Sequence, residues 1–320
     1  MTERAPMRPD QAGEVGPVAT EPRLRRAMLI GLLGAGVGPS LTPLMHELEG
    51  ARHGMHYVYR TVEVDDPRGV GELIDTARRL GFDGLNVTHP LKQAVVAVLD
   101  DLSATAREIV AVNTIVFTDA GVVGHNTDVT AFRSAFTESF PGVRPGHALL
   151  LGAGGGGAAV AAALAELGID RLTVVDTDAD RAAELARRIG ARGDTRAGSA
   201  APAEIPQLLP AVEAVVNATP VGMAAHPGSP VDPALLRPHH LVADIVYRPV
   251  RTPLLQAAER IGCRTMSGLG MAMHQAADAF EIFTATPADR AAMRADLEYL
   301  VAAEAAGQMP LRHTLGGERQ

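Results

Sequence analysis

The stretch HALLLGAGGGGAAVAAALAELGIDRLTVVDTD, residues 147–178, decides the fold class of this 320-residue chain. A short apolar run, 148–151, is followed at once by six residues of which five are glycine. An alanine-rich segment, 158–167, then has the composition of a helix, and 171–175 is a second apolar run. Strand, glycine turn, helix and strand in this order predict one βαβ unit of a parallel sheet.

The glycines of this turn have the spacing G-x-G-x-x-G, at Gly152, Gly154 and Gly157. The first glycine permits a tight turn, the second lets the backbone approach a pyrophosphate, and the third lets the helix pack closely on the strand. Unpaired N–H groups at the start of the following helix can bind phosphate. The pattern predicts a dinucleotide site, for which the candidate residues are Gly152, Ala153, Gly154, Gly155, Gly156 and Gly157.

The second strand ends in Asp176, 19 residues after Gly157. A carboxylate at this position accepts a hydrogen bond from the ribose 2′-hydroxyl and repels a 2′-phosphate, for which NADP sites supply an arginine. The next residues, Thr177 and Asp178, are not basic, and Arg181 is expected to face solvent from the next helix. We therefore predict NAD as the cofactor in preference to NADP.

Alternating apolar strands and amphipathic helices fill the rest of the chain and predict an α/β protein of two domains, one of them a doubly wound Rossmann-type domain. The further strands are expected at 27–33, 56–64, 84–87, 111–117, 121–124, 214–217 and 241–245. The further helices are expected at 43–49, 69–80, 91–99, 179–189, 271–283 and 287–303. We expect the first sheet to be mostly parallel. Thr42 and Thr286 each precede a proline and are predicted N-caps.

The order of these elements indicates where the domains begin and end. The alternation of strands and helices restarts after His147, so the first α/β part of the chain ends before the part that carries the dinucleotide turn. Residues 1–26 hold charges and prolines without an apolar run and are expected to form a disordered tail. Residues 306–320 are expected to fray.

The composition is typical of a soluble globular protein, with 47% hydrophobic and 21% charged residues. A formal net charge of −8 argues against nucleic-acid binding, which needs a basic face. No secretory signal or membrane-spanning run is apparent, and the single cysteine, Cys263, fits a reducing cytosol. We expect a cytoplasmic protein that acts on a small molecule, as a monomer or homodimer, without nucleic-acid or membrane partners.

Polar motifs follow apolar strands of the first half, at the strand ends where ligands bind in open α/β sheets. They are Asn86-Val87-Thr88-His89-Pro90-Leu91-Lys92 and Gly124-His125-Asn126-Thr127-Asp128, and a third segment, Ala111-Val112-Asn113-Thr114, places an amide between apolar residues. Hydride transfer to a ketone needs a proton donor at the carbonyl oxygen, and a tuned lysine can serve. Lys92 held by Asp128 is the candidate pair, although spacing alone leaves open a solvated lysine and a helix-capping aspartate. Ser40 and Thr42 offer two hydroxyls at a helix start, which suits a carboxylate.

With these motifs the chain resembles the shikimate dehydrogenase family over roughly residues 28–303. Five further motifs in the family's order carry the resemblance: Ser40-Leu41-Thr42-Pro43 with His46, Gly152-Ala153-Gly154-Gly155-Gly156, Asn217-Ala218-Thr219-Pro220-Val221-Gly222-Met223, Asp244-Ile245-Val246-Tyr247-Arg248-Pro249, and Gly268-Leu269-Gly270-Met271 with Gln275. The resemblance implies a discontinuous α/β substrate-binding domain, residues 27–128 and about 271–305, and a Rossmann dinucleotide-binding domain, residues 129–270, with the site between them. It also implies hydride transfer between a nicotinamide cofactor and the ring C3 hydroxyl or ketone of quinate or shikimate.

The resemblance implies a role for each matching residue, with Lys92 and Asp128 as the acid–base pair. The residues that would bind the substrate carboxylate and ring hydroxyls, or line the cleft, are Ser40, Thr42, Thr88, Asn113, Gln275 and Tyr247. Those that would lie beside the nicotinamide are Asn217, Thr219, Met223 and Gly268. No metal is expected, because His46, His89 and His125 lack the spacing of metal ligands and are assigned to local hydrogen bonds.

Two departures from the NADP-using members favour the NAD-dependent quinate/shikimate dehydrogenase branch. Asp176-Thr177-Asp178 stands where those members typically carry Asn-Arg-Thr or Asn-Arg-Ser, and Thr42 replaces a second serine. A biosynthetic NADP-dependent shikimate dehydrogenase and an aminoquinate or aminoshikimate dehydrogenase remain open alternatives. A non-catalytic sensor of quinate or NAD is disfavoured, because such a protein is expected to have lost the pair of Lys92 and Asp128.

Overall fold

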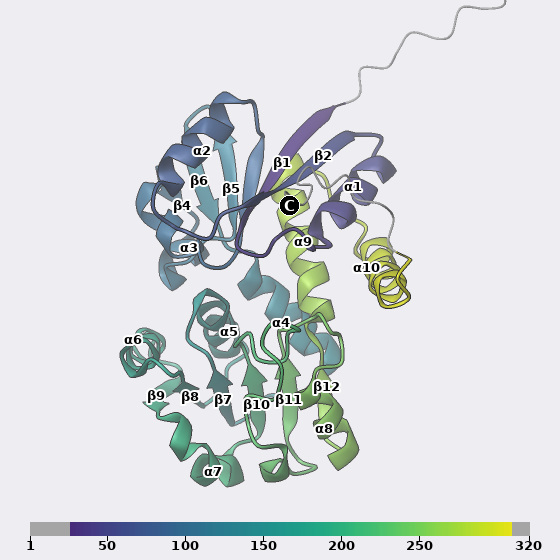
Figure 1. Ribbon diagram of the computed structural model, residues 1–320. Helices are drawn as coiled ribbons and strands as arrows, with labels where there is room; N and C mark the ends of the chain where they lie inside the picture. The colour runs from purple at the N-terminus through teal and green to yellow at the C-terminus, as the bar shows by residue number, and fades with distance from the viewer. Residues whose placement is uncertain (1–25, 309–320) are drawn as a thin grey trace, which may run out of the picture.

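The computed structural model of the chain describes residues 26–308, whose strands form two six-stranded sheets. Figure 1 shows one sheet above the other, with helices α4 (Asp128–Ser139) and α9 (Gly268–Thr284) between the two halves. The predicted α/β fold with two sheets is confirmed. The two predicted tails lie outside the described residues, apart from Arg26 and residues 306–308. None of the helices within 26–308 has the length and apolarity needed to cross a bilayer.

The first sheet has the strand order β2-β1-β3-β5-β6-β4 and is mixed. Its strands are β1 (Ala27–Gly34), β2 (His56–Glu63), β3 (Gly84–Val87), β4 (Asp101–Leu102), β5 (Thr114–Thr118) and β6 (Gly121–His125). β1 runs parallel to β2 and β3, whereas β5 is antiparallel to β3 and β6. Three of the five strand pairs are parallel, as expected of a mostly parallel sheet, and β5 is antiparallel because only two residues join it to β6 in a hairpin.

The second sheet is parallel throughout, in the order β12-β11-β10-β7-β8-β9. Its strands are β7 (His147–Leu151), β8 (Arg171–Val175), β9 (Arg196–Ala200), β10 (Ala214–Asn217), β11 (Leu241–Asp244) and β12 (Arg264–Met266). The chain runs outward from β7 to β9, returns to β10 on the other side of β7, and continues to β12. The carboxyl ends of β7 and β10 therefore form the topological switch point, where sheets of this kind bind ligands.

The remaining helices cover the two sheets. They are α1 (Thr42–Arg52), α2 (Val70–Arg79), α3 (Ala104–Ile109), α5 (Gly155–Glu166), α6 (Ala179–Gly190), α7 (Ile205–Leu208), α8 (Pro253–Ile261) and α10 (Arg290–Ala305), with 3-10 turns at 94–98, 202–204, 209–211 and 233–235. Both predicted threonine caps are wrong. Thr42 is already the first residue of α1, and Asp289 caps α10 by accepting a hydrogen bond from the N–H of Ala292.

The stretch from 91 to 140 differs most from the prediction. The expected helix 91–99 is a turn followed by a short 3-10 helix, consistent with the β-branched valines of the segment AVVAV at 94–98. The expected strand 111–117 begins only at Thr114. Helix α4 was not expected, although Phe132, Phe136 and Phe140 recur at helical spacing and are all buried.

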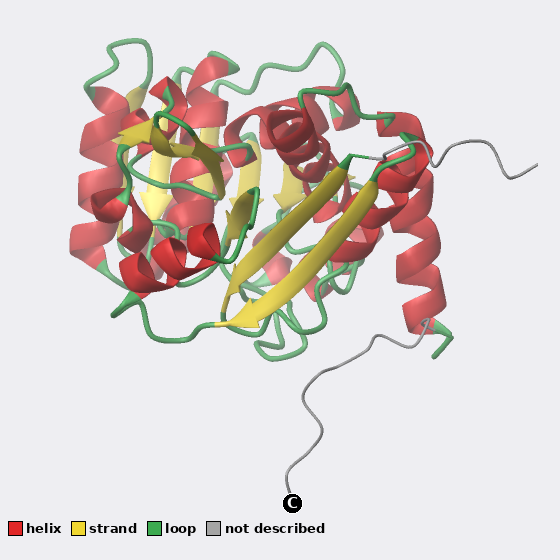
Figure 2. Cartoon of the chain, turned by 90° about the horizontal axis from the view of Figure 1, so that it is seen from above, coloured by secondary structure: helices red, strands yellow, loops and turns green. Residues whose placement is uncertain are grey.

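Helices α4 and α9 pack closely and join the two halves. A Cβ added to Gly270 of α9 would lie 3.2 Å from the Cβ of Ala135 on α4, so small residues permit the approach. Phe132 and Phe136 of α4 are buried in the same core cluster as the alanines of α5. Seen from above, the two longest strands, β1 and β2, lie side by side (Figure 2).

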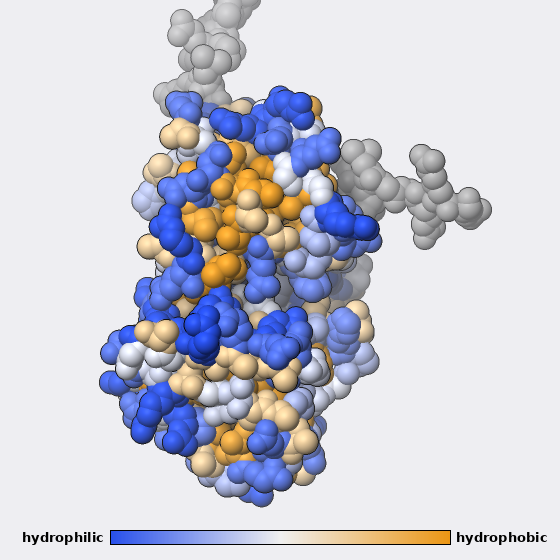
Figure 3. All heavy atoms as spheres, turned by 90° about the vertical axis from the view of Figure 1, so that its left-hand side faces the viewer, coloured by the Kyte–Doolittle hydropathy of each residue, from blue (hydrophilic) through white to orange (hydrophobic). Residues whose placement is uncertain are grey.

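Apolar side chains gather on the surface of the first half, on the side that carries α2 (Figure 3). The core cluster of this half has partly buried members on α2 and around the 3-10 turn at 94–98, namely Leu73, Val96 and Leu99. Val98 of the same turn is 46% exposed. Apolar side chains of the first half are therefore accessible to solvent on this side.

Gly84 of β3 offers a test of how tightly α9 packs on the first sheet. A Cβ there would lie 2.4 Å from the ring of Phe283 and 2.7 Å from the carbonyl oxygen of Ile115. Because neither a buried ring nor backbone can yield cheaply, Gly84→Ala should lower the free energy of unfolding by about 1–3 kcal/mol in urea titrations. The matched control is Gly198→Ala on β9, where a Cβ meets nothing within 4 Å. Equal stability of the two variants would contradict this packing.

Candidate active site

The glycine turn between β7 and α5 has the geometry that a pyrophosphate site needs. Gly152 has a φ of +97°, which residues with a side chain rarely adopt. A Cβ added to Gly157 would lie 2.0 Å from the carbonyl oxygen of Gly152, so only glycine lets α5 begin this close to the strand. A Cβ on Gly154 would point into open space, which leaves this face of the turn free for a ligand. Helix α5 begins at Gly155 rather than at 158, so its unpaired N–H groups belong to the turn itself.

Asp176, directly after β8, is hydrogen-bonded to the glycine turn. Its Oδ2 accepts from the N–H of Ala153 at 2.7 Å, and its Oδ1 accepts from the N–H of Asp178 at 2.9 Å. Burial alone would raise the pKa of Asp176, but these two N–H groups and the guanidinium of Arg181 together lower it. Asp176 is therefore an anion that fixes the glycine turn as well as a candidate ribose ligand.

Arg181 does not simply face solvent, as the sequence suggested. Its Nη2 lies 3.1 Å from Oδ1 of Asp176 and 3.7 Å from Oδ2 of Asp178, while 47% of its side chain is exposed. Side chains in the first turn of a helix point back towards its N-terminus, which brings Arg181 over both carboxylates. The cation nearest to the end of β8 is thus already paired.

Lys92 and Asp128, which are 36 residues apart in the chain, meet at the junction of the two halves. Nζ of Lys92 donates to Oδ2 of Asp128 at 2.7 Å, and the side chains are 19% and 6% exposed. A Cβ added to Gly155 would lie 3.2 Å from both Cβ and Cδ of Lys92, so the lysine stem packs on the glycine turn. The acid–base candidates and the dinucleotide turn therefore lie in one place.

Backbone contacts hold this pair in position. The N–H of Val112 donates to the carbonyl oxygen of Lys92 at 2.8 Å, which ties the turn after β3 to the segment before β5. The N–H of Asp128 donates to Oδ1 of Asn126 at 2.9 Å. Asp128 is also the first residue of α4, where the positive end of the helix dipole stabilises a carboxylate.

Lys92 is the only lysine in the sequence, since all the other residues among its 29 lysines and arginines are arginines. Arginine does not lose its proton in proteins, whereas lysine can act as an acid and as a base. A lysine at the junction with the glycine turn therefore favours proton transfer over simple charge pairing. The presence of a single lysine is a feature of the sequence that the motif-based prediction did not consider.

Four of the candidate substrate-binding residues border the loop that leads into α1. The N–H of Thr42 donates to Oγ of Ser40 at 3.3 Å, so these two residues share one turn. A Cβ on Gly34 would lie 2.3 Å from Cγ2 of Thr88, which places Thr88 against the start of the same loop. Tyr247 is half-buried and packs on the core cluster formed by α1, α9 and α10.

Asn113 and Gln275, the other two candidates, are joined through Thr127. Nδ2 of Asn113 donates to Oγ1 of Thr127 at 2.9 Å, and its Oδ1 accepts from the N–H of Thr127 at the same distance. Oγ1 of Thr127 in turn donates to the carbonyl oxygen of Gln275 at 3.2 Å. Because Thr127 precedes Asp128, this chain of bonds also fixes the start of α4, a role that the sequence did not reveal.

A buried amide organises the loop 218–223 after β10. Nδ2 of Asn217 donates to Oδ1 of Asp244 at 2.9 Å and to the carbonyl oxygen of Val221 at 3.0 Å. Its Oδ1 accepts from the N–H of Thr219 at 3.0 Å and from the hydroxyl of Thr219 at 2.6 Å. Asn217 is fully buried and has used both amide hydrogens, so it shapes this loop from within. Met223, on the same loop, is 43% exposed.

Asp244, at the end of β11, is the second organising residue and one to which sequence reasoning gave no role. Its Oδ2 accepts from the hydroxyl of Thr252, the N-cap of α8, at 2.7 Å. Burial raises the pKa of Asp244 to about 6, against the lowering effect of its hydrogen bonds. Beyond it, a Cβ on Gly268 would lie 2.3 Å from the carbonyl oxygen of Ile245, so the start of α9 packs on the loop after β11.

The three histidines singled out from the sequence differ in burial: His46 is buried, His125 is half-buried and His89 is exposed. Burial lowers the pKa of His46 to about 3, and its Nδ1 lies 3.1 Å from the hydroxyl of Tyr57. Burial also lowers the pKa of His125. Within residues 26–308, no three side chains of His, Cys, Asp or Glu gather as metal ligands would.

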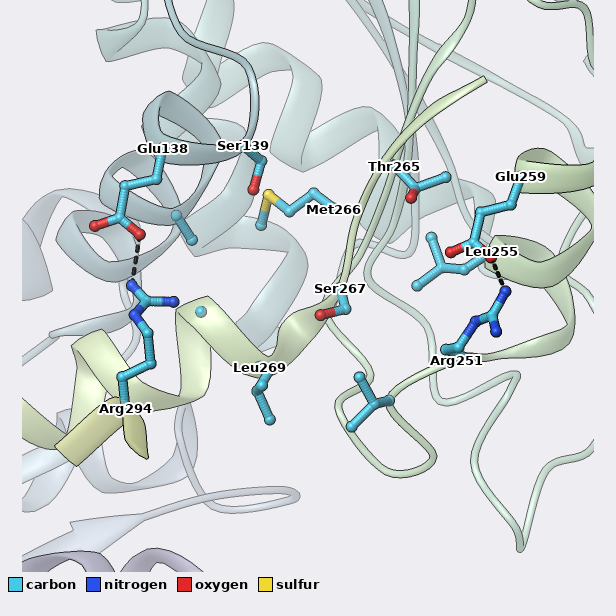
Figure 4. A pocket seen from close by; sticks show the side chains of 13 residues that line it. Glu138, Ser139, Arg251, Leu255, Glu259, Thr265, Met266, Ser267, Leu269 and Arg294 are labelled. Atoms are coloured by element: carbon cyan, nitrogen blue, oxygen red, sulfur yellow. Dashed lines mark hydrogen bonds and ion pairs between the residues drawn. The ribbon is translucent and has the colours of Figure 1, made fainter. Parts of the chain in front are cut away.

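A separate pocket lies beside the start of α9, among side chains from α4, α8, β12 and α10 (Figure 4). Its rim carries two ion pairs, Glu138 with Arg294 and Arg251 with Glu259. The residues that line it include neither the lysine–aspartate pair nor the glycine turn. This pocket is therefore distinct from the candidate active site.

Two family models match this chain, one in its first half and one near its C-terminal end. The shikimate dehydrogenase substrate-binding domain matches residues 32–115, and the shikimate 5′-dehydrogenase C-terminal domain matches residues 268–298. The chain is 49% identical to a shikimate dehydrogenase (NADP⁺) of Streptomyces avermitilis, over 89% of this chain and 98% of that protein. It is 44% identical to a quinate/shikimate dehydrogenase (NAD⁺) of Corynebacterium efficiens, over 84% of this chain and 97% of that protein.

Solved structures agree with these relatives. The structure of quinate dehydrogenase from Corynebacterium glutamicum in complex with NAD superimposes with a TM-score of 0.80 at 42% identity, covering 86% of this chain and 100% of that one. That of shikimate 5-dehydrogenase from Listeria monocytogenes, in complex with shikimate and NAD, gives a TM-score of 0.76 at 32% identity, covering 85% of this chain and 96% of that one. The structure of a shikimate dehydrogenase in complex with NADP⁺ also superimposes, with a TM-score of 0.79 at 31% identity, covering 86% of this chain and 96% of that one, so relatives solved with either cofactor share this fold.

The buried carboxyl of Asp244 makes stability depend on pH in a defined direction. In the folded chain the pKa of Asp244 is about 6, above the value of about 3.9 expected in the unfolded chain. The contribution of this carboxyl to stability is therefore full below about pH 3.9 and is lost as the pH rises through 6. The difference in unfolding free energy between the wild type and Asp244→Asn should therefore change by about 2 kcal/mol between pH 4 and pH 7. Urea titrations at both pH values measure it, with the exposed Asp119→Asn as control. An identical difference at both pH values would show that Asp244 does not titrate in this range.

Proposed function

The chain belongs to the shikimate dehydrogenase family, and we propose that it transfers a hydride between NAD and the ring carbon bearing the C3 hydroxyl of quinate or shikimate. Membership makes it an NAD(P)-dependent oxidoreductase, and the choice of NAD and of these two acids is the proposal. The observation that carries it is the pair of Lys92 and Asp128 packed on Gly155, because it sets a group able to carry a proton beside the dinucleotide turn.

The residues present fit a dinucleotide. NAD would supply the hydride acceptor in one direction, and in its reduced form the hydride donor in the other. The open face at Gly154 and the N–H groups at the start of α5 would hold its pyrophosphate. Oδ2 of Asp176 retains a lone pair for the adenosine ribose beside its bond to Ala153. Met223 and Gly268 would lie along the nicotinamide, on segments ordered by Asn217, Thr219 and Asp244.

Proton transfer in this proposal belongs to Lys92. When the alcohol is oxidised, Nζ takes the hydroxyl proton while the hydride leaves the ring carbon, and when the ketone is reduced Nζ returns a proton to the oxygen. Asp128, at 2.7 Å from Nζ, holds the amine and would accept a hydrogen bond from the substrate. The contact of the lysine stem with Gly155 restricts how far Nζ can move.

The substrate site would be built from hydroxyl and amide groups, which suits a polyhydroxylated acid. Ser40 and Thr42 would bind the carboxylate at the N-terminus of α1, where the helix dipole favours an anion. Thr88, Asn113 and Gln275 would hydrogen-bond the ring hydroxyls, and Tyr247 would close one side. Their positions around the loop before α1 and the start of α4 support this assignment.

The preference for NAD depends on the end of β8. Asp176 would repel a 2′-phosphate, and Arg181 is already paired with Asp176 and Asp178. A 2′-phosphate would have to displace these carboxylates before Arg181 could bind it. The relatives are divided, with an NADP-dependent enzyme at 49% identity and an NAD-dependent one at 44%, so the argument rests on these three residues.

A biosynthetic NADP-dependent shikimate dehydrogenase is the second candidate, favoured by the 49% identical relative and by the nearness of Arg181 to the ribose position. An aminoquinate or aminoshikimate dehydrogenase would use the same groups and differ in one ring substituent. A non-catalytic sensor has less support, because the paired Lys92 and Asp128 are both present.

Lys92→Arg tests whether the chemistry needs a proton carrier at this position or only a positive charge. The arginine keeps a cation beside Asp128 but cannot release a proton, so kcat for quinate or shikimate should fall at least 100-fold while NAD binding is retained. Stopped-flow or steady-state absorbance of NADH measures kcat, and fluorescence titration measures NAD binding. Wild-type kcat in this variant would remove Lys92 from the proposed mechanism.

Asp176→Asn tests the cofactor choice. The amide oxygen can still accept from Ala153, whereas the charge that repels a 2′-phosphate and pairs with Arg181 is lost. In the wild type we expect kcat/KM to be at least tenfold higher with NAD than with NADP, and in Asp176→Asn we expect that ratio to fall at least tenfold. Equal use of both cofactors by the wild type would favour the NADP-dependent alternative.

A further inference from the structure

Arg248, which follows Tyr247 in the loop after β11, contacts two segments that are distant in sequence. Its Nε donates to Oε2 of Glu304 at 2.8 Å and its Nη2 donates to Oε1, so the ion pair with α10 is bidentate. Its Nη1 donates to the carbonyl oxygen of Pro39, in the loop between β1 and α1. The side chain of Arg248 is 24% exposed. One guanidinium thus links the half that holds the dinucleotide turn to two elements of the other half.

The loop that Arg248 reaches is held at its start by its own half. The carboxylate of Glu63 accepts hydrogen bonds from the N–H groups of Gly36 and Val37. Gly36 has a φ of +63°, and Pro39, further along, is exposed. A glycine-rich loop loses much backbone entropy when it is ordered. The bond from Arg248 therefore constrains the part of the loop that lies next to Ser40.

Glu304 is an anchor for Arg248, because α10 packs on α1 and α9 through the buried Met293, Leu297 and Leu300 and is hydrogen-bonded to both helices at its start. The N–H of Asp289 donates to Oε1 of Glu49, a buried residue of α1, at 2.7 Å. Nη2 of Arg290 donates to Oδ1 of Asp278 on α9 at 2.6 Å. The loop after β11 is thus tied to a helix that packs on α1 and α9.

We propose that Arg248 is a positioning residue for the substrate carboxylate. Ser40 and Tyr247 come from different halves, so their separation depends on contacts that cross the junction. Arg248 makes such a contact one residue away from each of them, at the peptide oxygen of Pro39 and directly after Tyr247. The role rests on the proposed function, in which Ser40 and Thr42 bind the carboxylate. Loss of the clamp loosens substrate binding and leaves the proton-transfer pair in place.

Arg248→Met keeps the aliphatic stem and removes the hydrogen bonds to Glu304 and Pro39. KM for quinate and shikimate should rise about tenfold, with kcat and KM for NAD within about twofold of the wild type. Arg251→Met is the matched control, since it removes the same charge from the same loop but its partner, Glu259, lies in the same half. Unchanged KM for both acids in Arg248→Met overturns the inference.

Glu304→Gln distinguishes positioning from direct attraction between Arg248 and the substrate carboxylate. If Arg248 acts by holding the loop, weakening its anchor should raise KM, in the same direction as Arg248→Met. If Arg248 attracted the substrate as a free charge, removing a nearby anion would lower KM instead. A lower KM in Glu304→Gln would therefore rule out the positioning role.

Amide hydrogen exchange separates failure of this inference from failure of the proposed function. If the wild type oxidises neither acid, the proposed function fails, and exchange still tests the clamp. The N–H groups of Ser40 and Thr42 are bonded to Val37 and Ser40, and should exchange faster in Arg248→Met than in the wild type or Arg251→Met. Equal exchange rates in all three proteins would show that Arg248 does not order the loop.

Discussion

The contact between Lys92, Asp128 and Gly155 is the constraint on which the proposed chemistry depends. It joins a turn after a strand of the first sheet, the first residue of α4 and the phosphate turn of the second sheet. A side chain larger than that of glycine at 155 would meet the lysine stem, and a lysine without Asp128 would leave a charge poorly compensated at a mostly buried position. The position of one amine is thus determined by both halves of the molecule.

Further contacts fix the position of the two halves relative to each other around this contact. Helices α4 and α9 cross at Ala135 and Gly270, and Thr127 connects the start of α4 to α9. On the dinucleotide side, Asp176 braces the glycine turn while Asn217 and Asp244 order the loop after β10. Asp176 and Asn217, which the sequence singled out as candidate cofactor ligands, therefore also act as internal supports of their loops.

Local features could be predicted from the sequence, whereas features set by tertiary contacts could not. The strands at Gly84–Val87, Arg171–Val175 and Ala214–Asn217 and the glycine turn follow from short apolar runs and glycine spacing, which act within a few residues. The ion pair of Arg181 and the burial of Asp244 depend on neighbours that the order of residues does not reveal. The predicted caps at 42 and 286 failed because Asp289 caps α10 and Thr42 lies inside α1.

Because the sequence contains a single lysine, an amine-directed reagent tests the central claim on one side chain. Acylation would be followed by mass spectrometry of the peptide that contains Lys92, which distinguishes it from the α-amino group, together with assays of quinate and shikimate oxidation. We expect activity to fall in proportion to the modified fraction of Lys92, and NAD with substrate to slow both changes. Full activity in protein whose Lys92 is completely acylated would contradict the account.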